Sequence, residues 1–349
     1  APARVCLELT ISAAERAHAA ALIVNSRQTR SRSQTAFSYF RHRRARSATA
    51  QHPPMINIQQ CFVEQYLIDA ALDSGLVDLR WHSRVSTVTQ RPDRVSLTVD
   101  TPAGVYALDA AHVVACDGAR STVRDALGMR LEGNSYEGRY LIADIALRQD
   151  WPVERLAWFD PPSNPRSTVL AHRQPDNVLR VDYQLREDED PELEQQEARV
   201  RSRIDAHLQM LGRPPAYDLI WISLYRAHCL SLPRYREGRV LFAGDAAHLV
   251  PIFGVRGLNS GIDDAANLAW KLALVIDQRG DEALLDSYSH ERVYAAHENI
   301  RQARKSTMFM SPPSRGYALM RDAALSLAVS QPFARALVNP RQSTAIAYH

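Results

Sequence analysis

Two residues with clear chemical meaning follow an apolar segment at 239–243, which reads as a buried strand. Gly244 and Asp245 come directly after it. A carboxylate at the carboxyl end of a strand suits hydrogen bonds to ribityl or ribose hydroxyls. The loop that follows is rich in glycine, which keeps side chains away from a flat or anionic ligand. Its glycines are Gly254, Gly257 and Gly261. This stretch therefore predicts a site for such a ligand.

A strong helix pattern follows at 262–277, and Leu258 and Asn259 lie where this helix begins. Backbone N–H groups at a helix start lack partners within the helix, and the helix dipole is positive at this end. Both effects would stabilise negative charge on a ligand, such as the charge that a reduced flavin carries at its N1/O2 edge.

Other residues of this stretch are interpreted as structural. We expect His248 to be a packed, hydrogen-bonded residue rather than a catalyst. Asp263 and Asp264, in the first helical turn, are expected to serve the helix dipole. Trp270 is expected to pack within the protein, and Lys271 to lie on the helix surface.

A shorter arrangement of the same kind stands earlier in the chain. An apolar strand pattern at 111–116 runs into Asp117 and Gly118, where glycine lets the backbone turn and approach a ligand closely. Ser121 can cap the helix that follows, and Arg124 can reach a phosphate or a carboxylate. Alone, this pattern fits two interpretations: a ligand-binding turn, or a capped strand-to-helix turn with a surface arginine.

The elements that must position these residues alternate between helix and sheet. Residues 61–72 have helical spacing, and 95–110 read as a β-hairpin. The chain is strand-rich from 139 to 232, interrupted by an acidic helix at 187–211. Earlier, 15–24 could form a helix and 41–47 a basic loop. We divide the chain into an atypical basic segment (1–50), the first part of a cofactor-binding domain (51–138), a sheet domain for substrate (139–232), and the second part of the cofactor-binding domain with C-terminal helices (233–349).

The composition is that of a globular protein. The 349 residues are 46% hydrophobic and 23% charged, enough for two or three domains. A net charge of +3 is too nearly balanced to predict a nucleic-acid partner. No stretch approaches the roughly 18 apolar residues of a membrane span. The cysteines stand far apart, which predicts no metal site and a reducing, cytoplasmic location. They are Cys6, Cys61, Cys116 and Cys229.

Residues 1–50 differ from the rest of the chain. They hold nine Arg and two acids, so nine minus two gives a charge of +7. Such a composition is found in organelle transit peptides and in nucleic-acid-binding arms. A third interpretation, which we favour, is a truncated or altered N-terminus.

The two Asp/Gly stretches carry a resemblance to a known family. DGARSTVR at 117–124, followed by GDAAHLVPIFGVRGLNSGIDDAANLAWKLA at 244–273, resembles the group A flavoprotein monooxygenases. These are single-component FAD-dependent aromatic hydroxylases, and the 3-(3-hydroxyphenyl)propionate type is the nearer match. The resemblance runs from about 52 to the end. It implies an α/β FAD/NAD(P)-binding fold of the p-hydroxybenzoate hydroxylase type with a mixed-sheet substrate domain. That fold would be incomplete at the N-terminus, because the chain contains no GxGxxG.

The resemblance also implies roles for the first turn and for one residue ahead of it. Asp117 and Gly118 would sit near FAD and the NAD(P)H path. Arg124 would contact a cofactor phosphate or support its turn. Gln60, in PPMINIQQCFVEQYL, takes the place of a glutamine that sits beside the flavin in that subfamily.

The second turn and its loop would hold the rest of the flavin. Gly244 and Asp245 would hold the ribityl chain, and Pro251 would lie close to the isoalloxazine. Arg256 would add positive potential near the flavin. The pyrimidine edge would be bound by Gly257, Leu258 and Asn259. Substrate-facing candidates come from the strand before this motif, where alternate residues face opposite sides. They are Tyr225, Arg226 and His228.

The implied activity is hydroxylation of a small phenolic or aromatic substrate. NADPH or NADH would reduce FAD, and O2 would then form a C4a-hydroperoxyflavin that transfers one oxygen. A homodimer is a further expectation. Two alternatives stay open. One is a truncated, catalytically impaired family member or flavin-fold remnant with weak or no FAD binding, because the pyrophosphate-binding glycines are missing. The other is a flavin-dependent dehydrogenase or reductase that shares both turns.

Overall fold

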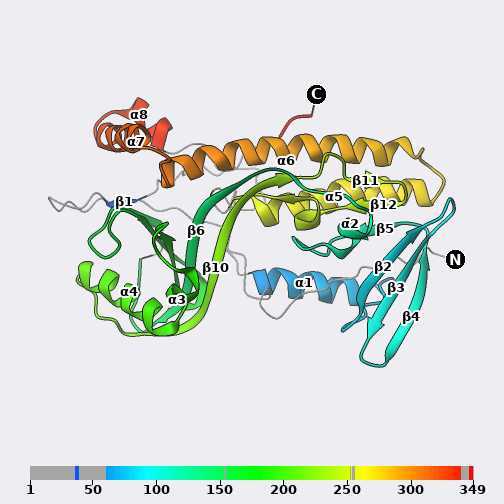
Figure 1. The fold of residues 1–349 in the computed structure, drawn as a ribbon, viewed down its shortest axis with the longest axis horizontal. Helices are drawn as coiled ribbons and strands as arrows, with labels where there is room; N and C mark the ends of the chain where they lie inside the picture. Colours follow the sequence, from blue (N-terminus) through cyan, green and yellow to red (C-terminus); the bar gives the residue numbers. More distant parts are fainter. Residues whose placement is uncertain are drawn as a thin grey trace, which may run out of the picture.

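The computed structural model describes residues 36–38, 60–152, 155–251, 253, 256–338 and 346–348 (Figure 1). The helix predicted at 15–24, the basic loop predicted at 41–47 and Gly254 lie outside these residues. Within the part that is described, no helix is long and apolar enough to cross a membrane.

One part of the molecule is built around a small sheet with two helices beside it. The sheet has the order β11-β12-β5, and β12 (Val240–Phe242) pairs with β5 (Val113–Ala115) in parallel. Strand β11 (Arg236–Glu237) pairs with β12 in antiparallel. Helices α5 (Gly257–Ile276) and α6 (Ala283–Met310) run side by side here (Figure 1). All three residues of β12 are buried, as the apolar pattern at 239–243 predicts.

The predicted β-hairpin at 95–110 and the helix predicted at 61–72 are confirmed. Strands β3 (Val95–Thr101) and β4 (Gly104–Ala110) pair in antiparallel, and β2 (Arg84–Gln90) extends them to a three-stranded sheet. Val95, Leu97 and Val99 face the core, so the alternation seen in the sequence separates a buried side from a wetter one. Helix α1 (Gln60–Asp73) precedes this sheet, and the short α2 (Thr122–Ala126) follows β5.

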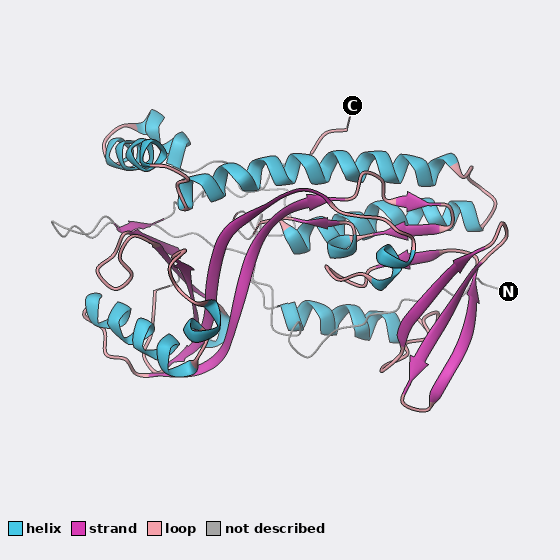
Figure 2. Cartoon of the chain, in the orientation of Figure 1, coloured by secondary structure: helices cyan, strands magenta, loops and turns pink. Residues whose placement is uncertain are grey.

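The other part is an antiparallel sheet with the order β1-β7-β8-β9-β6-β10-β13. Its longest strands, β6 (Glu132–Leu147) and β10 (Tyr217–Ser231), bend as a pair and extend toward the small sheet (Figure 2). The remaining strands are β1 (Ala36–Ser38), β7 (Arg155–Phe159), β8 (Thr168–Arg173), β9 (Val178–Leu185) and β13 (His248–Leu249). One face packs against helix α4 (Glu197–Met210) through Val200, Ile204 and Leu208.

The acidic helix predicted at 187–211 is divided into two helices. A short helix, α3 (Pro191–Glu194), begins at a proline and is capped by the Asp190 side chain. Proline disfavours helical backbone in the residue before it, so the helix does not extend back through Asp190. The backbone of Gln196 is extended, and α4 starts after it.

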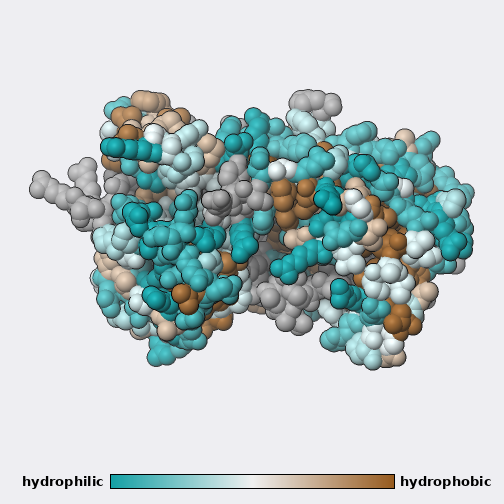
Figure 3. Space-filling view, in the orientation of Figure 1, coloured by the Kyte–Doolittle hydropathy of each residue, from teal (hydrophilic) through white to brown (hydrophobic). Residues whose placement is uncertain are grey.

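The C-terminal region is helical, as expected. A long helix, α6, is followed by α7 (Arg315–Ala328) and α8 (Pro332–Val338). Ala324, Leu325 and Ala334 belong to a small core of their own. Large apolar side chains also remain exposed on α7 and α8, and hydrophobic residues gather there in Figure 3. They include Leu319, Met320, Phe333 and Leu337.

Candidate functional site at the ends of two parallel strands

The two Asp/Gly turns predicted from the sequence lie at the same edge of the small sheet. Strands β5 and β12 are parallel, so the residues that follow them meet at one end. Gly118 has φ +80° and Gly244 has φ +60°, which is backbone that favours glycine. Asp245, just after Gly244, is exposed to solvent. The structure thus brings together two motifs that stand far apart in the chain.

Arg124 ties the two turns to each other. Its guanidinium donates to the carbonyl of Ala246 over 3.2 Å and to that of Ala119 over 2.8 Å. The residue is only 7% exposed, so the interpretation as a surface arginine is wrong. Of the two roles that the resemblance implies, the support of the turn fits this geometry.

Asp117 and Ser121 organise the start of α2. The Ser121 hydroxyl accepts the N–H of Arg124 over 2.9 Å, which confirms the predicted helix cap. The Oδ2 atom of Asp117 accepts the N–H of Val123 over 3.0 Å. Its Oδ1 atom is buried without a hydrogen-bond partner. A buried acceptor of this kind fits a ligand hydroxyl at this edge.

The turn at Gly244 touches the first turns of α5. A Cβ atom added at Gly261 would lie 3.4 Å from the Cα of Gly244, so two glycines permit this close backbone approach. The Gly244 N–H donates to Oδ2 of Asp264 over 2.9 Å.

Asp264 is a buried acceptor that joins three elements. Helix α5 begins at Gly257 and has no acidic residue in its first turn, so the predicted role of Asp263 and Asp264 at the helix dipole is wrong. The residue is 0% exposed. Besides Gly244, it accepts from Nε2 of His248 over 2.7 Å and from Nε of Arg292 over 2.6 Å. The interpretation of His248 as a packed, hydrogen-bonded residue is confirmed. Arg292, on α6, was not predicted, because the motif around Asp264 carries no sign of a partner so far along the chain.

The N-terminus of α5 carries the residues expected at a ligand's negative edge. The helix begins at Gly257, five residues before the predicted start at 262. Leu258 and Asn259 are exposed in its first turn. Arg256, just before the helix, is buried and donates to Oδ1 of Asn299 over 2.6 Å. Burial lowers the pKa of the Arg256 guanidinium below its ordinary value.

The predicted environments of Trp270 and Lys271 are reversed. Trp270 is 51% exposed and Lys271 is 1% exposed. The Lys271 ammonium donates to the Ser287 hydroxyl over 2.8 Å and pairs with Glu291 over 2.9 Å. Both partners lie on α6, which packs along the side of α5 that carries Lys271.

Of the three substrate-facing candidates, Tyr225 lies against the loop of the second motif. Its hydroxyl donates to the carbonyl of Val250 over 3.0 Å, next to the buried Pro251. Burial raises the pKa of Tyr225 well above its ordinary value. Arg226 is exposed, and a β-bulge separates it from His228. The alternation of a strand therefore separates Tyr225 from Arg226, as expected.

Tyr225 packs against an aromatic cluster that the sequence did not predict. The rings of Tyr140 and Phe253 meet edge to face with centroids 5.1 Å apart. Ala157, Leu170 and Met310 pack in the same cluster. The cluster therefore joins the large sheet, the second-motif loop and the end of α6. Tyr140 was not predicted because its strand resembles any other apolar strand.

Gln60 begins α1, where its amide donates to Glu64 over 2.7 Å.

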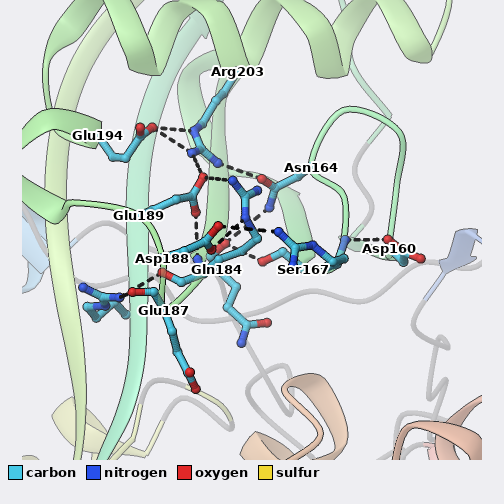
Figure 4. Close-up of polar contacts among 12 residues, drawn as sticks. Asp160, Asn164, Ser167, Gln184, Glu187, Asp188, Glu189, Glu194 and Arg203 are labelled. Atoms are coloured by element: carbon cyan, nitrogen blue, oxygen red, sulfur yellow. Dashed lines mark hydrogen bonds and ion pairs between the residues drawn. The ribbon is translucent and has the colours of Figure 1, made fainter. Parts of the chain in front are cut away.

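A pocket in the other part of the molecule, beside α3 and α4, is lined by charged side chains (Figure 4). There Arg203 bonds to Asn164 over 2.7 Å and to Glu194 over 2.7 Å, and it also contacts Glu189. The ion pairs join α4 to α3 and to the segment before it, and the hydrogen bond to Asn164 joins α4 to the loop between β7 and β8. No cluster of metal-ligating side chains occurs within the residues that the structure describes.

This fold, with its two glycine–aspartate turns at one sheet edge and a helix N-terminus beside them, is the α/β FAD-binding fold of the aromatic hydroxylases. A model of the FAD binding domain family matches residues 10–303. The chain belongs to the FAD-binding monooxygenase family. The match starts well before position 52, so it takes in residues that the resemblance did not cover.

Known relatives and solved structures agree with this assignment. A 3-(3-hydroxyphenyl)propionate/3-hydroxycinnamic acid hydroxylase of Mycolicibacterium gilvum is 35% identical over 77% of this chain and 46% of its own length. One of Burkholderia cenocepacia is 33% identical over 77% of this chain and 48% of its own. The chain thus spans about half the length of these relatives.

Among solved structures, p-nitrophenol 4-monooxygenase of Pseudomonas putida superposes with a TM-score of 0.67 at 25% identity, covering 82% of this chain and 73% of its own. Anhydrotetracycline hydroxylase of Streptomyces rimosus superposes with a TM-score of 0.69 at 29% identity. The match covers 86% of this chain and 59% of the hydroxylase.

Proposed function

We propose that this chain is the FAD-binding and substrate-binding part of an aromatic monooxygenase. It would hydroxylate a small phenolic or aromatic substrate, with NADPH or NADH as the reductant and O2 as the oxidant. The observation that carries this proposal is the meeting of both Asp/Gly turns and the α5 N-terminus at one sheet edge. The names of the relatives support an aromatic substrate. A cytoplasmic homodimer remains part of the proposal.

The residues at this edge fit FAD. The exposed carboxylate of Asp245 and the buried, unpartnered Oδ1 of Asp117 are acceptors for the hydroxyls of a ribityl chain or a ribose. The first-turn N–H groups of α5 and the guanidinium of Arg256 favour a negatively charged ligand edge. When bound, FAD would supply the acceptance of a hydride and the activation of O2.

The protein side chains would exclude water and position the loop beside the cofactor. The aromatic cluster around Tyr140 and Phe253 would exclude water from the region between the sheet and the loop. Tyr225 holds the loop through Val250, so it would orient Pro251 against the ring system. None of these residues needs to act as an acid or a base, because the cofactor carries the oxygen chemistry.

The first test is a titration of the purified chain with FAD, followed by flavin fluorescence. We expect saturable binding, and we expect Asp245→Ala to weaken it by about ten- to a hundredfold, since a hydrogen bond to a charged group contributes roughly 1.5–3 kcal/mol. Asp263→Ala removes an exposed aspartate of the same motif and is the matched control. Equal affinities for the two variants would contradict the assignment of Asp245.

Products formed with and without O2 then separate the alternatives. A hydroxylated phenol that requires O2 supports the monooxygenase. Oxidation of the substrate without O2 would indicate a dehydrogenase. Absence of FAD binding by the wild-type chain, even at high FAD concentration, would favour a remnant that has lost cofactor binding.

A further inference from the structure

The side chain of Asn299, on helix α6, reaches the proposed cofactor edge. Its Oδ1 atom accepts from Nη1 of Arg256 over 2.6 Å, and its Nδ2 atom donates to Oγ of Ser260 over 2.8 Å. All three residues are buried, and Asn299 is 5% exposed. One amide therefore connects the residue before α5 with the first turn of α5.

A second contact from α6 holds the same end of α5. Arg292 donates to the carbonyl of Ser260 over 3.2 Å and to Asp264 over 2.6 Å. Arg292 and Asn299 stand seven residues apart, about two helical turns, so they lie on one face of α6. Asp264 in turn accepts the N–H of Gly244. These contacts link α6 to the α5 N-terminus and to the turn after β12.

We propose that Asn299 is a positioning residue for the negatively charged edge of the flavin. This inference rests on the proposed function, because it assumes that FAD lies at the α5 N-terminus. Asn299 holds the guanidinium of Arg256 and the first-turn N–H groups of α5 in one fixed arrangement. The positive potential of this edge is then in place before the flavin gains negative charge, so little reorganisation is needed on reduction.

The amide is the chemical group that this position requires. Asparagine offers an acceptor and a donor on one short side chain, and both are used here. Leucine has a similar size and offers neither. Aspartate keeps the acceptor for Arg256 but adds a negative charge beside it, which opposes negative charge on a neighbouring ligand.

The experiment compares Asn299→Leu with Asn267→Leu in the full chain. Asn267 also joins α5 to α6, through a 2.7 Å bond to Glu291, but it lies farther along α5, away from the N-terminus. Hydrogen exchange is measured on peptides that cover residues 256–261, without FAD. We expect exchange there to become about tenfold faster or more in Asn299→Leu and to stay near the wild-type rate in Asn267→Leu. Equal exchange in both variants would overturn the proposal.

A second measurement is the midpoint potential of bound FAD in a variant that adds a negative charge at position 299. A merely structural role of Asn299 would leave this potential unchanged. We expect Asn299→Asp to weaken the binding of reduced relative to oxidised flavin by about tenfold. That change lowers the midpoint potential by about 30 mV for a two-electron couple. Asn267→Asp is the charge-matched control and should leave the potential near that of the wild type. An unchanged potential in Asn299→Asp would overturn the role toward the flavin.

The two measurements keep this inference separate from the proposed function. If the wild-type chain binds no FAD, the proposed function fails, and the role toward the flavin fails with it. The hydrogen-exchange comparison still decides whether Asn299 holds the α5 N-terminus.

Discussion

At the scale of single residues, Asp264 is the group whose loss should cost most. Its carboxylate faces the guanidinium of Arg292, and both side chains are buried. Burial alone would lower the pKa of Arg292, but the ion pair with Asp264 raises it above its ordinary value. The arginine therefore stays charged, and it depends on Asp264 for compensation.

We expect Asp264→Ala to lower the free energy of unfolding by about 3–5 kcal/mol, because it leaves a buried guanidinium without its partner. Urea unfolding, followed by circular dichroism, measures this change. The double variant Asp264→Leu with Arg292→Met removes both charges and should recover part of the loss. A loss below about 1 kcal/mol in the single variant, the range of a surface ion pair, would contradict this account.

Residue environments were predictable where the local sequence decides them. His248 stands in an apolar stretch, and it is buried as the first residue of β13. The environments of Trp270 and Lys271 were not predictable, because neighbours on a helix point about 100° apart. Which of the two is buried depends on where α6 packs. The partners of Lys271 lie on that second helix and leave no mark in the sequence around α5.

At the scale of elements, the packing of α4 on the sheet contains a buried histidine. His207 lies within 2.7 Å of the Ser163 hydroxyl through Nδ1, and its ring meets Trp158 edge to face. Burial lowers the pKa of His207 to about 4. An unfolded chain would bind a proton at this residue near pH 6.5, well before the folded protein does.

The stability of the protein should therefore fall as the pH falls from about 6.5 toward 4, since the unfolded state takes up the proton first. We expect His207 to account for about 2 kcal/mol of loss between pH 7.5 and pH 5. Urea unfolding at both pH values tests this in the wild type and in His207→Gln. A pH dependence that is the same in both proteins would exclude His207 as its source.

Element types were largely predictable, and their ends and partners were not. Alternation at 95–110 and helical spacing at 61–72 decide those elements locally. Helix α5 starts earlier than its apolar pattern, since its first turn is held from outside by Arg292 and Asn299. The pairing of β5 with β12 joins Val113 to Val240, a contact that no local pattern reveals.

At the scale of the whole molecule, two continuous strands link two cores. One core lies around β12 and α5, and the other lies between the large sheet and α4. Strands β6 and β10 pair from Glu132 opposite Ser231 to Leu147 opposite Tyr217, and they bend from one region to the other (Figure 2). The aromatic cluster at Tyr140 connects the two regions again.

We therefore expect one cooperative unfolding transition for the described regions. Of the five tryptophans, Trp151 and Trp158 are buried in the sheet core, so their fluorescence should change most when that core unfolds. Far-ultraviolet circular dichroism reports mainly on helices such as α6. Urea curves from the two probes should coincide. Separated midpoints would mean that the two cores unfold independently.

The parallel pairing of β5 with β12 also has a consequence for how the protein is made. Strand β5 is synthesised long before its partner, and most of the large sheet lies between them in the chain. Antiparallel neighbours such as β8 and β9 need only short loops, so we expect them to form while the ribosome is still at work. Only when β12 emerges are the two Asp/Gly turns joined. The edge that we assign to the cofactor is thus completed only after most of the large sheet has been synthesised.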